Sequence, residues 1–202
     1  MTPRLSGRYF LRMKDMKSEK HSHLVETLID GAQMYRGKLL DVRLDRVRLA
    51  NGVESTREYV KHQGAVVVIP LLENGKMIFE RQFRYPLGQV VTEFPAGKID
   101  PGESIETTAK RELLEETGYT AREWRHVGVM HPCVGYSDER LEIFFARGLV
   151  RQGDQNLDHG ELLDLFEMTL QEASAAVRAG DITDAKTIAA LFWAEKIILS
   201  DW

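Results

Sequence analysis

The chain has 202 residues, the length of one domain with at most a small appendage, and it is long enough to bury a sizeable core. Its 27 basic and 31 acidic residues leave a net charge of −4, which gives no reason to expect nucleic acid or an anionic membrane as a partner. Cys133 is the only cysteine, so no internal disulfide can form, and no apolar run approaches the roughly 18 residues of a membrane span. We therefore expect a cytoplasmic protein that binds neither nucleic acid nor membrane.

Residues 1–22 are expected to form a flexible basic tail, and residues 23–61 to contain antiparallel strands. Apolar residues alternate through Leu44 and then slip by one position, which predicts a bulged strand ending near Leu49. Asn51-Gly52 is a hairpin signal, and a second strand follows it. Two strands do not bury enough apolar surface to be stable alone, so this pair must pack against something else.

The remainder of the chain, residues 62–202, mixes strand and helix patterns. Residues 65–72 are nearly all apolar, which predicts a buried strand, and the Asn74-Gly75 turn leads into the next. Further strands are expected at residues 77–83, 90–94, 124–130, 141–146 and 162–168, and helices at residues 105–117, 170–179 and 184–200. Helices intermixed with neighbouring hairpins predict an α+β or mixed α/β fold in layers.

The first of these helices gathers like charges at a cost. Ser104 is a good N-cap, and Gly118 fits the position that ends a helix. Glu112 precedes Glu115 and Glu116 by three and four residues, and like charges at these spacings destabilise a helix by roughly 0.2–0.5 kcal/mol per pair. The last two glutamates also lie in the final turn, where the helix dipole favours cations.

The position of these glutamates on the helix separates two interpretations. Glu112 and Glu116 fall beside the apolar flank formed by Ile105, Ala109 and Leu113. Most charge runs form a solvated face, but carboxylates that border an apolar stripe are partly withdrawn from water and need a partner. One arginine cannot neutralise three of them, whereas Mg²⁺ could, because it takes oxygen ligands. We therefore favour a metal site over a solvated face.

The same stretch resembles the signature of the Nudix hydrolases. The matching positions are Gly97, Glu103, Arg111, Glu112, Leu113, Glu115, Glu116 and Gly118, with Tyr119 in the last apolar position. The resemblance implies an α/β/α sandwich, here with an N-terminal antiparallel strand appendage. It also implies hydrolysis of a nucleoside diphosphate linked to another moiety, with Mg²⁺ or Mn²⁺ as cofactor.

Beyond the signature, the likeness extends over roughly residues 42–199. The segments REYVKHQGAVVV, QFRYPLGQVVTEFPAGK, GYSDE and DAKTIAALF are similar to the ADP-ribose pyrophosphatase branch of the family. Members of that branch form dimers through their N-terminal strands and share substrate sites between subunits. The resemblance therefore implies a homodimer that converts ADP-ribose to AMP and ribose 5-phosphate.

The resemblance also assigns roles to individual residues. The metal ligands would be the backbone carbonyl of Ala96 and the carboxylates of Glu112, Glu115 and Glu116. Arg111 would orient these glutamates by ion pairing, and Glu103 would support the loop before the helix.

Residues outside the signature would bind the substrate. Arg57 and Glu58 would reach the nucleotide, and Arg84 would contact the diphosphate. Glu93 and Glu139 would line the site. The alternative for Arg57 and Arg84 is a surface ion pair.

The catalytic base is expected in the loop before the last strand. Glu161 keeps the second acidic position of the family's loop motif, whereas His159 stands where its first glutamate usually lies. We favour Glu161, because an anion is better tolerated beside cations than an imidazole that becomes positive on taking a proton. His159 is the alternative, since imidazole titrates near neutrality, and a signature glutamate such as Glu115 is a third candidate.

The sequence departs from the branch at Val134, where proline is usual, at His159, and at Lys38, where an apolar or aromatic residue often lies near adenine. Two alternatives therefore stay open. One is the same chemistry on another nucleoside diphosphate derivative, such as NADH, a dinucleotide or a nucleotide sugar. The other is a ligand sensor without catalysis, which the intact set of glutamates argues against.

Overall fold

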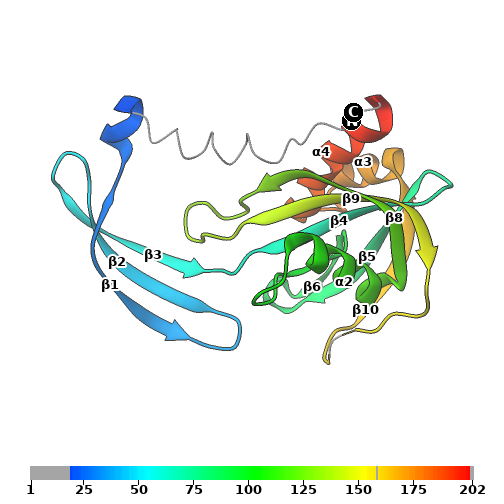
Figure 1. The fold of residues 1–202 in the computed structure, drawn as a ribbon, viewed down its shortest axis with the longest axis horizontal. Helices are drawn as coiled ribbons and strands as arrows, with labels where there is room; N and C mark the ends of the chain where they lie inside the picture. The colour runs from blue at the N-terminus through cyan, green and yellow to red at the C-terminus, as the bar shows by residue number, and fades with distance from the viewer. Residues whose placement is uncertain (1–18, 158, 201–202) are drawn as a thin grey trace. The chain divides into compact units, whose positions relative to one another are not determined.

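The computed structural model describes residues 19–157 and 159–200 and divides the chain into two compact units (Figure 1). Of the described residues, the first unit contains residues 19–61 with Gly135–Ser137, and the second contains residues 62–134, 138–157 and 159–200. Of the tail expected over residues 1–22, residues 1–18 lie outside the described residues. The remaining four belong to a short 3₁₀ helix, η1 (Glu19–Leu24).

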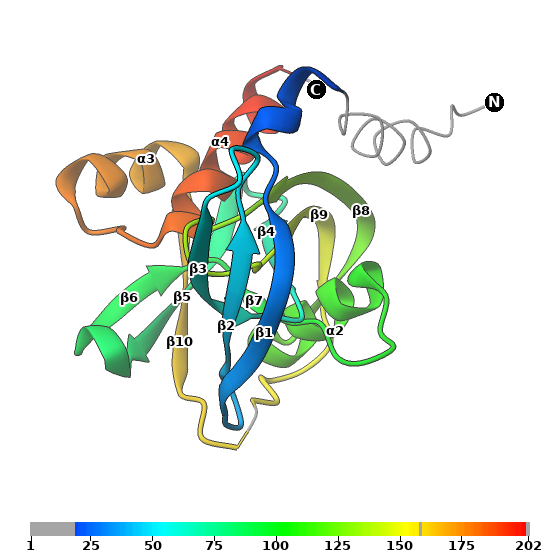
Figure 2. The same ribbon diagram turned by 90° about the vertical axis from the view of Figure 1, so that its left-hand side faces the viewer.

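The first unit is a three-stranded antiparallel sheet in the order β1-β2-β3 (Figure 2). Its strands are β1 (Thr27–Arg36), β2 (Asp41–Arg48) and β3 (Glu54–Lys61). The predicted hairpin is therefore present, but the bulge lies elsewhere. The β2–β3 register is unbroken, whereas β1 shifts register against β2 between Leu28 and Asp30 and again between Gln33 and Tyr35. The bulge predicted from the apolar spacing of β2 is therefore wrong. Because β2 has few buried positions, the slip in its apolar spacing does not mark a bulge.

The second unit is built on a mixed sheet with the strand order β10-β5-β4-β9-β8, to which β6 and β7 add by pairing with β5 and β4. Strand β4 runs parallel to β9, and the other pairs are antiparallel. The strands are β4 (Ala65–Leu71), β5 (Lys76–Arg84), β6 (Gln89–Glu93), β7 (Ala96–Lys98), β8 (Tyr119–Met130), β9 (Leu141–Arg151) and β10 (Leu163–Thr169), with a 3₁₀ turn, η2 (Tyr85–Leu87), after β5.

Helices cover both faces of this sheet, as Figures 1 and 2 show. Successive side chains of β4 point to opposite faces, so Val66 and Val68 pack with α2 (Ile105–Thr117). Val67 and Ile69 pack with α3 (Leu170–Ala179) and α4 (Ala185–Ser200) on the other face. The unit is an α/β/α sandwich, which confirms the expected fold class.

Most elements of this unit lie where the sequence predicts them. The exceptions are β7, which was expected to be part of a loop, and β8 and β9, which extend beyond the predicted strands. No helix in the described part of the chain is long and apolar enough to cross a membrane.

Candidate active site

Helix α2 begins and ends at the predicted residues. Ser104 Oγ accepts a hydrogen bond from the backbone N–H of Thr107 at 3.1 Å, which caps the first turn. Gly118 has a φ of 73°, and its N–H donates to the Leu114 carbonyl at 2.8 Å. Only glycine adopts this left-handed conformation without strain, so Gly118 fixes the end of the helix.

The last turn of α2 contains no basic residue. Its carbonyl groups are instead bound by the loop between β9 and β10. The Asn156 N–H donates to the Glu115 carbonyl at 2.8 Å, and Gln155 Nε2 donates to the Glu116 carbonyl at 2.6 Å. The loop is thereby fixed to the part of the helix that carries two of the signature glutamates.

Two signature glutamates are buried against β7, as their place on the helix predicts. Glu116 is 5% exposed and Glu112 is 9% exposed. Glu116 Oε2 accepts a hydrogen bond from the Ala96 N–H at 3.0 Å. A Cβ atom on Gly97 would lie 1.9 Å from Glu112 Oε1, so a side chain at residue 97 would force the Glu112 carboxylate to move. Ile105, expected on the apolar flank, is instead 36% exposed, since it lies at the start of the helix.

Arg111 holds the acidic side chains around it. Its Nε and Nη2 both donate to the Glu103 carboxylate at 3.0 Å, a bidentate pair. Its Nη1 donates to Glu112 at 2.9 Å and to Glu115 at 3.0 Å. These bonds with Arg111, and a further one from Thr108, lower the pKa of Glu103 to about 2. Glu103 thus accepts hydrogen bonds from two nitrogens of Arg111, whereas Glu112 and Glu115 share the single nitrogen Nη1.

The negative charges of the buried glutamates of α2 are only partly neutralised by the groups around them. Burial, followed by the neighbouring charges of Glu80 and Glu112, raises the pKa of Glu116 to about 10. Burial raises the pKa of Glu112 to about 7, although Arg111 opposes the shift. Like charges in a site withdrawn from water are typical of functional sites.

Glu80 of β5 belongs to this group, and the sequence analysis missed it. Its side chain is 1% exposed, and burial, followed by the charge of Glu93, raises its pKa to about 8. Its Oε2 is the one buried side-chain nitrogen or oxygen without a hydrogen-bond partner in the described residues. A signal was present, because Glu80 directly follows three apolar residues, 77–79, and so continues a strand that is buried on both faces.

Glu93 of β6 lies directly opposite Glu80 across the β5–β6 pair. Its carboxylate accepts hydrogen bonds from Arg84 Nε at 2.6 Å and Arg84 Nη2 at 2.7 Å, and it also pairs with Lys186 of α4. Burial acts to raise the pKa of Glu93, but these two cations outweigh it and hold the pKa below its usual value. Arg84 and Glu93, predicted as separate substrate contacts, are thus ion-paired. Lys186, which was not predicted, completes the pair.

The loop before β10 brings Glu161 close to the buried carboxylates. Its charge is among the causes that raise the pKa of Glu80, Glu112 and Glu116. Glu161 is half-buried, whereas His159 is exposed. Of the two candidate bases, Glu161 is thus the one with an electrostatic link to the acidic group.

Three predicted residues are not among the contacts of this group described above. Glu139 lies in the loop between β8 and β9, where its carboxylate is 3.9 Å from His62 Nδ1. Arg57 and Glu58 lie on β3 of the first unit. There Arg57 pairs with Glu26, as in the surface ion pair considered as its alternative role.

The donor set fits a hard divalent cation, which prefers oxygen ligands. Glu112, Glu115 and Glu116 stand in one helix beside Ala96, and Glu80 adds an unsatisfied buried oxygen from the sheet. Within residues 19–157 and 159–200, no three acidic, imidazole or thiol side chains converge as ligands around one point. The reason is that Glu112 and Glu115 turn to Arg111, and Glu116 turns to the Ala96 N–H.

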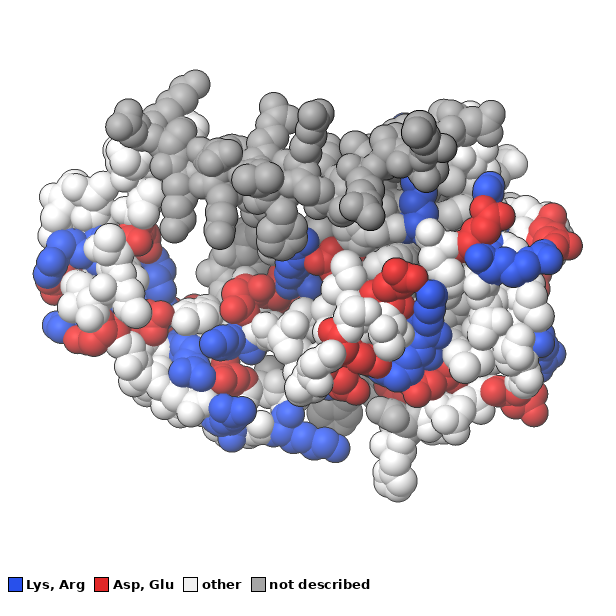
Figure 3. All heavy atoms as spheres, viewed as in Figure 1, with Lys and Arg blue, Asp and Glu red and all other residues white. Residues whose placement is uncertain are grey.

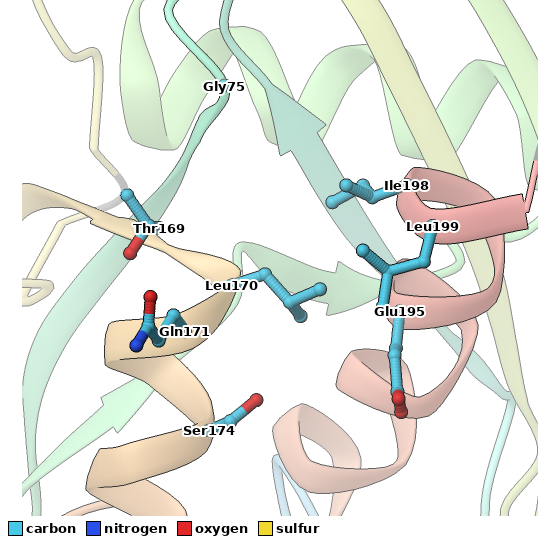
Figure 4. Close-up of a pocket in the computed structure, with 8 residues that line it drawn as sticks. All are labelled: Gly75, Thr169, Leu170, Gln171, Ser174, Glu195, Ile198 and Leu199. Carbon is cyan, nitrogen blue, oxygen red and sulfur yellow. The ribbon is translucent and has the colours of Figure 1, made fainter.

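A depression between α3 and α4 lies elsewhere in this unit (Figure 4). It is lined by Gly75, Thr169, Leu170, Gln171, Ser174, Glu195, Ile198 and Leu199. None of these lining residues is basic, so they offer no positive side chain to a diphosphate. Figure 3 shows that acidic and basic side chains are interspersed on the face viewed there, rather than gathered into one basic surface.

Comparisons with known proteins place this geometry in context. A family model described as the NUDIX domain matches residues 61–191. The chain is 41% identical over 169 residues to an ADP-ribose pyrophosphatase of Bacillus subtilis (strain 168), covering 83% of this chain and 91% of the relative. It is 37% identical over 167 residues to a methanol dehydrogenase activator of Bacillus methanolicus, covering 82% and 90%. The crystal structure of an ADP compounds hydrolase shares the fold, with a TM-score of 0.79 and 24% identity over 88% of this chain and 97% of that one.

Proposed function

Because the chain belongs to the NUDIX family, we propose that it hydrolyses the diphosphate bond of ADP-ribose, giving AMP and ribose 5-phosphate. The observation that carries the proposal is the group of buried, undercompensated glutamates on α2 beside β7. The 41% identity to an ADP-ribose pyrophosphatase over most of both chains supports the choice of substrate.

We propose that Ala96, Glu112, Glu115 and Glu116 hold Mg²⁺, or Mn²⁺ in its place. When bound, the ion supplies charge neutralisation to the diphosphate and helps to deprotonate a water molecule. The buried carboxylates favour such an ion, because it removes the repulsion that raises their pKa values. Arg111 keeps Glu112 and Glu115 oriented through its Nη1.

In this proposal Glu161 takes a proton from the attacking water. Its place beside the buried carboxylates supports this role, as does the anchoring of its loop to α2. Arg84 binds the diphosphate. Two of its three guanidinium nitrogens donate to Glu93, which orients the side chain and leaves Nη1 to donate to a phosphate oxygen.

We further propose that the protein is a cytoplasmic homodimer formed through the sheet of the first unit. Strand β1 is exposed along almost its whole length, including Leu28, Met34 and Tyr35. A partner that covers these apolar side chains would stabilise the sheet. In such a dimer Arg57 and Glu58 would contact the nucleotide, and Glu139 would line the site. Light scattering at micromolar concentration should give twice the chain mass, and a fully active monomer would contradict the dimer.

A substrate panel with Mg²⁺ tests the main proposal. ADP-ribose, NADH, a dinucleotide and a GDP-sugar would be compared by kcat/KM, with products separated by chromatography. ADP-ribose should be the best substrate, with AMP as a product. A higher kcat/KM for another compound would keep the chemistry and change the substrate. No hydrolysis of any compound, with binding retained, would indicate a ligand sensor instead.

A further inference from the structure

Glu80 is a buried carboxylate that the Nudix signature does not include. It lies in the middle of β5, it is 1% exposed, and its Oε2 has no hydrogen-bond partner among the described residues. An ionised carboxylate in such a place carries a large desolvation cost unless another group compensates its charge. Glu80 therefore needs a compensating group that its hydrogen bonds do not supply.

The face of the sheet that Glu80 occupies follows from the strand. Met77 and Phe79 pack in the core beneath α3 and α4. Because side chains alternate along a strand, Glu80 points to the opposite face, which α2 covers. Glu116 of α2 is buried on that face, and the charge of Glu80 is among the causes that raise the pKa of Glu116.

The nearby cations do not pair with Glu80. Arg84 directs both Nε and Nη2 to Glu93, and Lys186 pairs with Glu93 and with Asp184. Arg111 is bonded to the carboxylates on and before α2. Neither set of ion pairs therefore supplies a partner to the free oxygen of Glu80.

We infer that Glu80 is a further ligand of the divalent cation, supplied by the sheet rather than by α2, and that it shares the ion with Glu116. This inference rests on the proposed function, because it assigns one more residue to the same metal site. A divalent cation accepts several carboxylate oxygens and neutralises both charges at once. The competing explanation is a proton shared between the two carboxyl groups, with no cation at Glu80.

The direct test uses the unmodified chain. Crystals soaked in Mn²⁺ would be examined by anomalous scattering, and the ion should lie within about 2.3 Å of a Glu80 oxygen, as an oxygen ligand does. Manganese bound on α2 but well beyond that distance from Glu80 would overturn the inference. This measurement does not depend on the folding of any variant.

Variants give a second test in solution. Glu80→Gln keeps the shape of the side chain and removes its charge, and Glu80→Met removes the polar group if the amide variant does not fold. Calorimetric titration of the metal-free chain with Mn²⁺ should show a Kd at least about tenfold weaker than in the unmodified chain, or one ion fewer. An unchanged or tighter Kd would favour the shared proton and overturn the inference.

Glu142→Gln provides the matched control. Glu142 is also a buried glutamate of the sheet, but its oxygens accept from His126 Nε2 at 2.6 Å and from Arg140 Nε at 2.5 Å. Its removal should leave Mn²⁺ binding unchanged. Hydrolysis of ADP-ribose by the unmodified chain is measured separately. Activity with no ion at Glu80 refutes only this inference, whereas an ion at Glu80 without activity refutes only the proposed function.

Discussion

Helices α2 and α3 have similar ends but differ in the charges of their last turns and in the glutamates that they bury. Both begin at a hydroxyl cap, Ser104 or Thr169, and both end at a glycine with positive φ, Gly118 or Gly180. Helix α3 places Glu172 in its first turn and Arg178 in its last, as the helix dipole favours. Helix α2 has no basic residue in its last turn and buries two glutamates.

Under the proposed function, α3 serves the fold alone, whereas α2 also serves the site. Every local choice in α3 agrees with helix formation, whereas α2 keeps charges that oppose it and relies on Arg111 and the β9–β10 loop for support. Sequences depart from local rules chiefly where a site requires it. Variants of the two helices should therefore separate activity from stability.

Removing a charge from α2 should give the largest effect. Glu112→Gln or Glu116→Gln should lower kcat/KM by about 10³-fold, because each removes a proposed metal ligand worth several kcal/mol in the transition state. The metal-free variant should melt no lower than the unmodified chain, since a like-charge repulsion is relieved. Retained activity with a sharply lower melting temperature would instead make these residues structural.

The loop anchored to α2 should give the next effect. Glu161→Gln should lower kcat by about 10²-fold with little change in KM, the scale of a lost general base. His159→Ala serves as the comparison and should cost less than tenfold. The reverse order would identify His159 as the base, and two mild effects would move the role to a signature glutamate such as Glu115.

Filling the space beside Glu112 should disturb the site sterically. In Gly97→Ala the new methyl group would overlap the Glu112 carboxylate, and overpacking of this kind costs about 1–3 kcal/mol. Activity should fall about tenfold or more. Gly153→Ala is the matched control, because a Cβ there meets no atom within 4 Å. Equal losses in the two variants would argue against the close approach.

The charges of α2 should also make stability depend on pH. Glu112 and Glu116, with folded pKa values of about 7 and 10, keep their protons where the unfolded chain has released them. The stability they contribute is complete below pH 4.5 and is lost as the pH rises through the folded values. Each retained proton corresponds to about 1.4 kcal/mol per pH unit. Glu80, with a pKa of about 8, acts in the same direction.

Thermal melts between pH 5.5 and 8 would measure this dependence. In a chelator the melting temperature should fall as the pH rises. With saturating Mg²⁺ the fall should shrink or reverse, because ligand carboxylates bind the ion only after they lose their protons. A flat profile in the chelator would mean that these carboxylates are already compensated.

A change in α3 should have the smallest effect and none on activity. Glu172 caps the helix by accepting from the Thr169 N–H at 2.8 Å. Glu172→Ala should lower stability by about 1 kcal/mol, which is a few degrees in melting temperature. The kcat/KM should stay unchanged, and a loss of activity would show that α3 contributes to the site.

Features encoded locally could be predicted from the sequence. The ends of α2 follow from Ser104 and Gly118, and the burial of Glu112 and Glu116 follows from their place beside an apolar stripe. Strand β7 could not be predicted in the same way. It has three residues after a proline, and it is a strand because of its pairing with β4, some 30 residues earlier in the chain.

The missed site residues have the same explanation. Glu80 directly follows three apolar residues, which is a local signal that it continues a buried strand. Its place in the site, however, depends on β6 and β10, which pair on the two sides of β5. The pairing of Glu93 with Lys186 likewise joins segments far apart in sequence, whereas Arg84 and Glu93 meet across the β5–β6 pair. A resemblance can suggest that Arg84 and Glu93 both serve the site, but only tertiary structure shows that they bind each other.

The hydrogen bonds from the β9–β10 loop to the end of α2 limit how far Glu161 can travel. Asn156 is hydrogen-bonded to the helix, and Leu163 is paired in β10. Glu161 therefore lies in a short connecting segment, in which each residue spans at most about 3.6 Å. Inserting or deleting residues in this segment would change how far Glu161 can reach without altering the helix. Because loop closure costs rise slowly with length, such insertions or deletions should leave the core intact while they change the distance from Glu161 to the buried carboxylates.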